Sequence, residues 1–123
     1  AMHAAVRFAL ELFYGTDGKA LFVRLDPFEP GALDGTTIVV RTPAVASAAL
    51  QSEAGGSAGD LITALDRVLE LSIPFDRLAE AGAPARFAIE IRNADGATQR
   101  IPGDGFIELV RPEDDPSRYD WFV

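Results

Sequence analysis

Alternation of apolar and polar residues with a period of two, broken by Asp-Gly turns, constrains this chain more than any other feature. "ARFAIEIR", residues 85–92, puts three large apolar side chains on one side of an extended strand, because successive side chains point to opposite faces. "GTDG" at 15–18 and "NADG" at 93–96 follow alternating runs, and an Asp-Gly pair in that position predicts a β-hairpin. The pattern therefore predicts antiparallel strands with one apolar face each.

The same signature recurs along the chain and predicts an all-β fold. Strands are expected at residues 6–14, 19–26, 36–41, 85–92, 97–102 and 105–112. The segments at 27–35 and 51–60, rich in Pro, Gly or polar residues, are expected to be loops. "FDRLAEAG" at 75–82 supplies at most one short helical turn, closed by Gly82. We expect an antiparallel β-sandwich, jelly-roll or immunoglobulin-like, with seven or eight strands.

The segment "DLITALDRVLEL", residues 60–71, fits two patterns. Its apolar residues also follow the spacing of an amphipathic helix, with Asp60 as the N-cap. The alternation that continues through Ile73 and ends at Pro74, together with the β-rich surroundings, favours a strand. The apolar side of that strand is expected to lie on a facing sheet.

Glu70 lies on the outward side of this predicted strand. An outward carboxylate is expected to pair with a cross-strand arginine such as Arg86 or Arg92. Glycoside hydrolysis would instead need a second carboxylate nearby, Glu90 or Glu108. A sheet face rarely offers the enclosed pocket that tunes a catalytic acid, so we expect Glu70 to be structural and the domain to be non-catalytic.

Composition excludes several classes of function. The 123 residues suit one domain, expected over residues 5–123, with residues 1–4 as an expression scar and frayed terminus. The net charge of −8 argues against binding nucleic acid. No apolar run approaches the roughly 20 residues that span a bilayer, and no secretory leader is visible, so we expect no membrane partner and a cytoplasmic location. Without Cys there is no disulfide and no thiolate metal site.

The aromatic end of the chain holds the candidate ligand-binding residues. Trp121 and Tyr119 would form a stacking platform for a sugar ring, with Asp120 accepting hydroxyl hydrogen bonds. Tyr14, beside the first turn, is a secondary candidate. The alternative, which we favour, is that Trp121 closes the edge of the sandwich or packs on a neighbouring domain. Tyr14 has the same alternative.

Metal and cofactor chemistry is not expected. The acidic segment 113–115, with Asp120, lacks the spaced ligands and central glycine of an EF-hand loop, and a solvated loop is the simpler interpretation. His3 is the sole histidine, and no nucleophile motif accompanies it. We therefore expect no cofactor.

Three stretches of the second half carry a family resemblance. "VLELSIPFDRLAEAG", "ARFAIEIRNADGATQRIPGDGFIELVRP" and the ending "YDWFV" resemble the C-terminal β domain of glycoside hydrolase family 57 proteins, which are amylase- and glucanotransferase-like enzymes. The positions that carry the likeness are Glu70, Pro74, Leu78, Pro102, Gly105 and Trp121. The hairpin "FALELFYGTDGKALFVRLD" also resembles the opening of sandwiches related to family 9 carbohydrate-binding modules.

This resemblance implies an accessory domain rather than an enzyme. The catalytic carboxylates of such a protein would lie on a separate barrel domain. The implied partners are a polysaccharide, with α-glucan expected, or the parent catalytic domain. Family 9 modules hold a sugar between two tryptophans, whereas this chain has Trp121 alone. A structural domain that packs on the barrel without touching sugar is the alternative.

Overall fold

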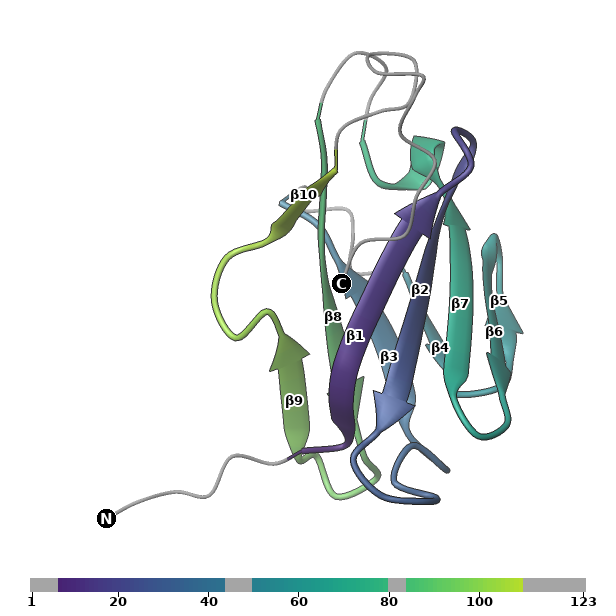
Figure 1. The fold of residues 1–123 in the computed structure, drawn as a ribbon, viewed down its shortest axis with the longest axis vertical. Coiled ribbons are helices and arrows are strands. Elements are labelled where there is room, and N and C mark those ends of the chain that lie inside the picture. The colour runs from purple at the N-terminus through teal and green to yellow at the C-terminus, as the bar shows by residue number, and fades with distance from the viewer. Residues whose placement is uncertain (1–6, 44–49, 80–83, 110–123) are drawn as a thin grey trace.

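The computed structural model describes residues 7–43, 50–79 and 84–109, which form two antiparallel sheets packed face to face (Figure 1). Ten strands make up these sheets: β1 (Ala9–Thr16), β2 (Ala20–Pro27), β3 (Thr37–Arg41), β4 (Gln51–Glu53), β5 (Ser57–Ala58), β6 (Leu61–Leu65), β7 (Leu69–Pro74), β8 (Ala85–Arg92), β9 (Thr98–Ile101) and β10 (Ile107–Leu109). The fold is an all-β antiparallel sandwich, as the alternation predicts.

The strand order places segments that are distant in the sequence side by side. The first sheet runs β1-β2-β7-β6-β5, so the first hairpin is joined to the β5–β7 meander through the β2–β7 pair. The second sheet runs β10-β8-β3-β4, and β9 also pairs with β8. Strands β9 and β10 pair with different parts of β8, β9 at residues 89–92 and β10 at residues 85–87.

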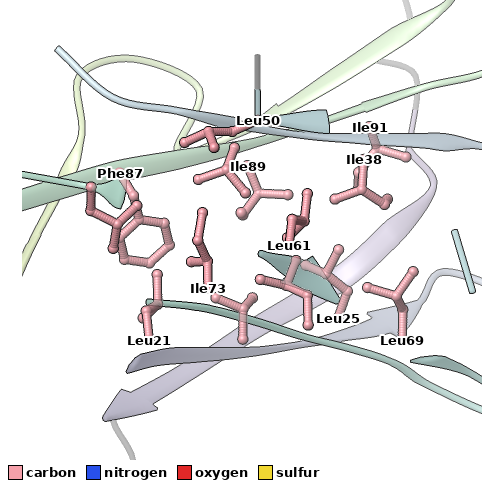
Figure 2. Packing of buried hydrophobic residues seen from close by; sticks show 14 of the residues in the cluster. Leu21, Leu25, Ile38, Leu50, Leu61, Leu69, Ile73, Phe87, Ile89 and Ile91 are labelled. Carbon is pink, nitrogen blue, oxygen red and sulfur yellow. The ribbon is translucent and has the colours of Figure 1, made fainter. Parts of the chain in front are cut away.

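Large apolar side chains from both sheets fill the space between them (Figure 2). The first sheet contributes Leu21, Leu25, Leu69 and Ile73, and the second contributes Ile38, Phe87, Ile89 and Ile91. All eight are fully shielded from solvent. The inward side of β7 and of β8 is therefore the side that the alternation predicts.

The structure corrects the predicted number of strands. Residues 51–60, expected to be a loop, hold the short strands β4 and β5 on either side of a tight turn. Residues 60–71 form β6, a turn and the start of β7, where Asp66 N–H donates to the Val68 carbonyl at 3.0 Å. The helical alternative for this segment is wrong. Its apolar spacing mimics a helix because the turn interrupts the alternation between two strands.

Thr63 fixes the passage of the chain from the second sheet to the first. Its hydroxyl accepts the Gly55 N–H at 2.7 Å and lies 2.8 Å from the Gly56 carbonyl, to which it can donate. Gly55 has a φ of +90°, a backbone conformation that glycine adopts without strain. A buried Thr side chain thus fixes the turn between β4 and β5, whereas the polar sequence of residues 51–60 predicts only a loop.

The single helical element of the described residues is a 3-10 turn at Phe75–Arg77, which confirms a short helical turn after Pro74, but the turn ends at Leu78 and not at Gly82 as expected. The buried ring of Phe75 anchors it. Within the same residues, no helix is long and apolar enough to cross a bilayer.

The side chain of Gln99 joins the outer edges of the two sheets. It lies on β9, and its Oε1 accepts the backbone N–H groups of Phe8 and Ala9 at 2.7 and 2.8 Å. Its Nε2 donates to the Ala9 carbonyl at 3.0 Å. At this point β1 carries a register shift between Ala9 and Glu11, so that Ala9 is buried and Leu10 is exposed. The strict alternation expected for this strand therefore begins only after the irregularity.

Candidate ligand-binding face

The outward side of the first sheet carries two aromatic rings among charged residues. Phe22 on β2 lies between Gly15 on β1 and Ser72 on β7, and the row continues to Ile62 on β6. The next row along the strands runs Phe13, Arg24, Glu70 and Ala64. We call these two rows the aromatic face. Both phenyl rings are half-buried rather than covered.

A groove with a volume of about 490 Å³ lies on this face. Six residues line it: Phe13, Phe22, Val23, Arg24, Glu70 and Leu71. Val23 and Leu71 are buried and direct their side chains into the core. The ligand-facing chemistry of this groove, which we call the Phe22 groove, therefore consists of two phenyl rings, a guanidinium and a carboxylate.

The guanidinium of Arg24 is held in place by Asp26. Its Nε and Nη2 donate to the two carboxylate oxygens at 2.7 and 3.0 Å, and its Cζ lies 4.8 Å from the ring centroid of Phe13. The hydrogen bond to Asp26 raises the pKa of Arg24 above its usual range, and the negative charge of Glu70 adds to the effect. The guanidinium thus stacks on the ring and remains charged.

The carboxylate of Glu70 has no hydrogen-bonded or ion-paired partner among the residues that the structure describes. Its cross-strand neighbours are Arg24 and Ala64. The expectation that Arg86 or Arg92 would balance it is wrong, because both lie on the other sheet. The Glu70 carboxylate is therefore available to a ligand in the groove.

The outward carboxylates of β8 and β10 on the second sheet are already paired. Arg86 donates to Glu108 at 3.0 Å, while Glu90 accepts from Arg41 at 2.7 Å and from Arg92 at 3.0 Å. These groups lie on the side of the sandwich opposite to Glu70. Glu70 is the one carboxylate among the six described residues that line the groove, whereas glycoside hydrolysis uses a pair of carboxylates.

The environment of Glu90 makes the fold sensitive to acid. Burial alone would raise the pKa of Glu90, but hydrogen bonds from the two arginines outweigh it and hold the pKa below the ordinary value of 4.5. A carboxyl with a depressed folded pKa stabilises the fold above its unfolded pKa, and this contribution is lost as the pH falls through and below 4.5.

We expect Glu90→Gln to lower the free energy of unfolding by about 1 to 3 kcal/mol at pH 7, because the ionised partner of two guanidinium groups is removed. The deficit relative to the wild type should shrink below pH 4.5. Urea unfolding at pH 7, 5 and 3.5 measures the difference in free energy of unfolding between the two proteins. Glu108→Gln, which breaks an exposed pair, is the control and should change stability by less than about 0.5 kcal/mol. A deficit for Glu90→Gln that is the same at all three pH values would contradict this account.

The structure locates one of the four residues predicted to bind a sugar. Tyr14 packs nearly edge-to-face on Phe87, with ring centroids 5.7 Å apart and an interplanar angle of 74°. It is therefore part of the packing between the sheets. Trp121, Tyr119 and Asp120 lie outside the described residues, as do His3 and the acidic segment 113–115.

The aromatic face was not predicted as a site. Its sequence signal is a large aromatic residue on the polar side of an alternating strand, seen at Phe13 and again at Phe22. Within residues 7–43, 50–79 and 84–109, no cluster of three or more His, Cys, Asp or Glu side chains could hold a metal ion.

No family model, curated protein or solved structure matches this chain significantly. The class of protein is therefore defined by the fold alone, an all-β antiparallel sandwich with a ligand-sized groove on one outer sheet face.

Proposed function

We propose that this chain is a non-catalytic accessory module that binds carbohydrate through the Phe22 groove, with an α-glucan as its ligand. The observation that carries the proposal is that one groove holds two phenyl rings and the carboxylate of Glu70, which has no ion-paired partner among residues 7–43, 50–79 and 84–109. The resemblance to the C-terminal β domains of glycoside hydrolase family 57 proteins supports the same class of ligand.

Sugars present two kinds of surface that this groove matches. The axial C–H groups of a pyranose form an apolar patch that packs on a ring such as Phe13 or Phe22, while the hydroxyls donate hydrogen bonds to a carboxylate such as Glu70. Arg24 and Glu70 are the charged groups of the aromatic face, and the adjoining row adds the carboxylates of Glu11 and Asp26, so this side of the sheet has a net negative charge. That charge disfavours phosphorylated and other anionic ligands.

A second candidate function is attachment to a neighbouring catalytic domain. Ile62 is 57% exposed and extends the row of Phe22 toward β5, as an apolar contact with another protein would require. In that case Ile62→Ser would release the partner without affecting sugar binding. The two functions are therefore separable by substitution.

Affinity gel electrophoresis against starch, glycogen, pullulan and a β-glucan tests the proposal. We expect the α-glucans to retard the wild-type protein, and Phe22→Ala or Glu70→Gln to weaken binding about tenfold, the effect of losing roughly 1.4 kcal/mol. Phe22→Ala removes a stacking ring, and Glu70→Gln removes the charged acceptor at constant size.

Matched controls come from elsewhere on the molecule. Phe106 is 39% exposed beneath Arg100, and Glu108 is an exposed carboxylate of the second sheet. Phe106→Ala and Glu108→Gln should bind as the wild type does. The proposal fails if no α-glucan retards the wild-type protein, or if Phe22→Ala and Phe106→Ala behave alike.

A further inference from the structure

Two further hollows adjoin the Phe22 groove. A hollow of about 250 Å³ lies over the β6–β7 turn and shares Glu70 with the groove. A pocket of about 540 Å³ lies at the end of the sandwich and shares Leu65, Asp66 and Arg67 with that hollow. We call them the hairpin hollow and the end pocket. Shared lining residues thus connect all three in sequence from the sheet face to the sandwich end.

The end pocket carries an aromatic ring of its own. Phe28 lines it and is 47% exposed, with the Arg7 guanidinium 5.1 Å from its ring centroid. The Phe28 N–H donates to the Phe8 carbonyl at 2.9 Å, which ties the start of the β2–β3 loop to the residue that precedes β1. A phenyl ring beside a guanidinium repeats the pairing of Phe13 with Arg24 in the groove, although Phe28 is the more exposed of the two rings.

The loop that forms this pocket is preorganised. Ala32 N–H donates to the Glu29 carbonyl at 3.0 Å, and Asp34 N–H donates to the Gly31 carbonyl at 3.1 Å, so two turns follow each other. Leu33, which is 1% exposed, fastens the loop to the core. A ligand would therefore meet a formed surface, which lowers the entropic cost of binding.

We propose that the groove, the hairpin hollow and the end pocket form one track that holds a linear, uncharged α-glucan chain over several sugar residues, with Phe28 as its distal stacking position. This inference rests on the proposed function of the Phe22 groove and adds the length of the ligand. A single sugar ring would occupy only one hollow. A chain would contact rings at both ends of the track and carboxylates between them.

Charge along the track argues for an uncharged polymer. The carboxylates that line it are Glu29, Asp34, Asp66 and Glu70. Arg67 and Arg24 also line the track, and Arg24 is already neutralised by Asp26. Arg7 lies over Phe28 as a third cation, so the four carboxylates still outnumber the two remaining positive charges. An acidic polysaccharide would be repelled along this path, whereas neutral hydroxyls find acceptors on it.

Isothermal titration calorimetry with maltotriose and maltoheptaose tests the length of the site. We expect the wild type to bind maltoheptaose at least about tenfold more tightly than maltotriose, a gain of roughly 1.4 kcal/mol. Phe28→Ala should abolish most of that gain and leave the affinity for maltotriose unchanged. Phe22→Ala should weaken binding of both sugars.

The control is Phe106→Ala, because Phe106 has similar exposure and also lies 5.1 Å from an arginine guanidinium carbon, that of Arg100. It should bind both sugars as the wild type does, and urea unfolding of each variant checks the fold. The proposed track would be wrong if the wild type bound the two sugars with equal affinity, or if Phe28→Ala kept the whole preference for maltoheptaose. The proposal for the Phe22 groove would still stand in either case. Failure of the wild type to bind either sugar would overturn the proposed function itself.

Discussion

Phe87→Ala is expected to lower the free energy of unfolding by about 3 to 5 kcal/mol, the range for removing a fully buried phenyl ring. Phe87 is 0% exposed and lies on β8, a strand that pairs with β3, β9 and β10. Its ring also supports the edge contact with Tyr14 from the facing sheet. Deleting it removes apolar burial and opens a cavity between the two sheets, which the rigid strands can close only in part.

Urea unfolding monitored by circular dichroism measures this loss. Phe106→Ala removes the same atoms from a ring that is 39% exposed, and it should change stability by less than about 1 kcal/mol. Phe87→Leu keeps most of the volume and should fold with a loss of about 1 kcal/mol, so it gives a value even if Phe87→Ala does not fold. A loss for Phe87→Ala no larger than that for Phe106→Ala would contradict the core position of Phe87.

Sequence patterning predicted the parts of this fold where one strand has one clear apolar face. The alternating residues of β2, β7 and β8 point inward as expected, because burial of one face fixes which side chains face the core. The Asp-Gly turns after β1 and β8 are also where they were predicted. The local sequence pattern was sufficient to predict these strands and turns.

Other elements depend on contacts that the sequence does not display. Strands β4 and β5 are too short to show alternation, and the turn between them is held by Thr63 from a later strand. The turn at Asp66–Val68 contains neither Gly nor Pro, so the sequence predicts one continuous segment there.

The Phe22 groove could not be predicted from the sequence because it also depends on contacts between distant strands. Alternation places Phe22 and Arg24 on the outward side of their strand, but it does not say which strand lies next to them. The pairing of β2 with β7, which brings Glu70 beside Arg24, joins strands far apart in the chain. The family resemblance implies Trp121 instead, which lies in a part of the chain that the structure does not describe.

Gln99→Leu is expected to lower the free energy of unfolding by about 2 to 4 kcal/mol, although the two side chains have similar size. The amide of Gln99 satisfies three backbone groups at the register shift of β1: two N–H groups, of Phe8 and Ala9, and the Ala9 carbonyl. Ala9 is 0% exposed, so water replaces these bonds poorly when the amide is lost. The amides of Phe8 and Ala9 should also exchange their hydrogens faster, because the start of β1 is released from β9.

Gln51→Leu is the matched control. Gln51 lies on the short strand β4, is exposed, and makes no side-chain hydrogen bond to the described residues, so its replacement should cost less than about 0.5 kcal/mol. Gln99→Glu separates the contributions, since a carboxylate can still accept the two N–H groups but cannot donate to the Ala9 carbonyl. The decrease in free energy of unfolding for Gln99→Glu should fall between the decreases for Gln99→Leu and Gln51→Leu. Equal stability of Gln99→Leu and Gln51→Leu would show that β1 is held to the second sheet by core packing alone, and not by this amide.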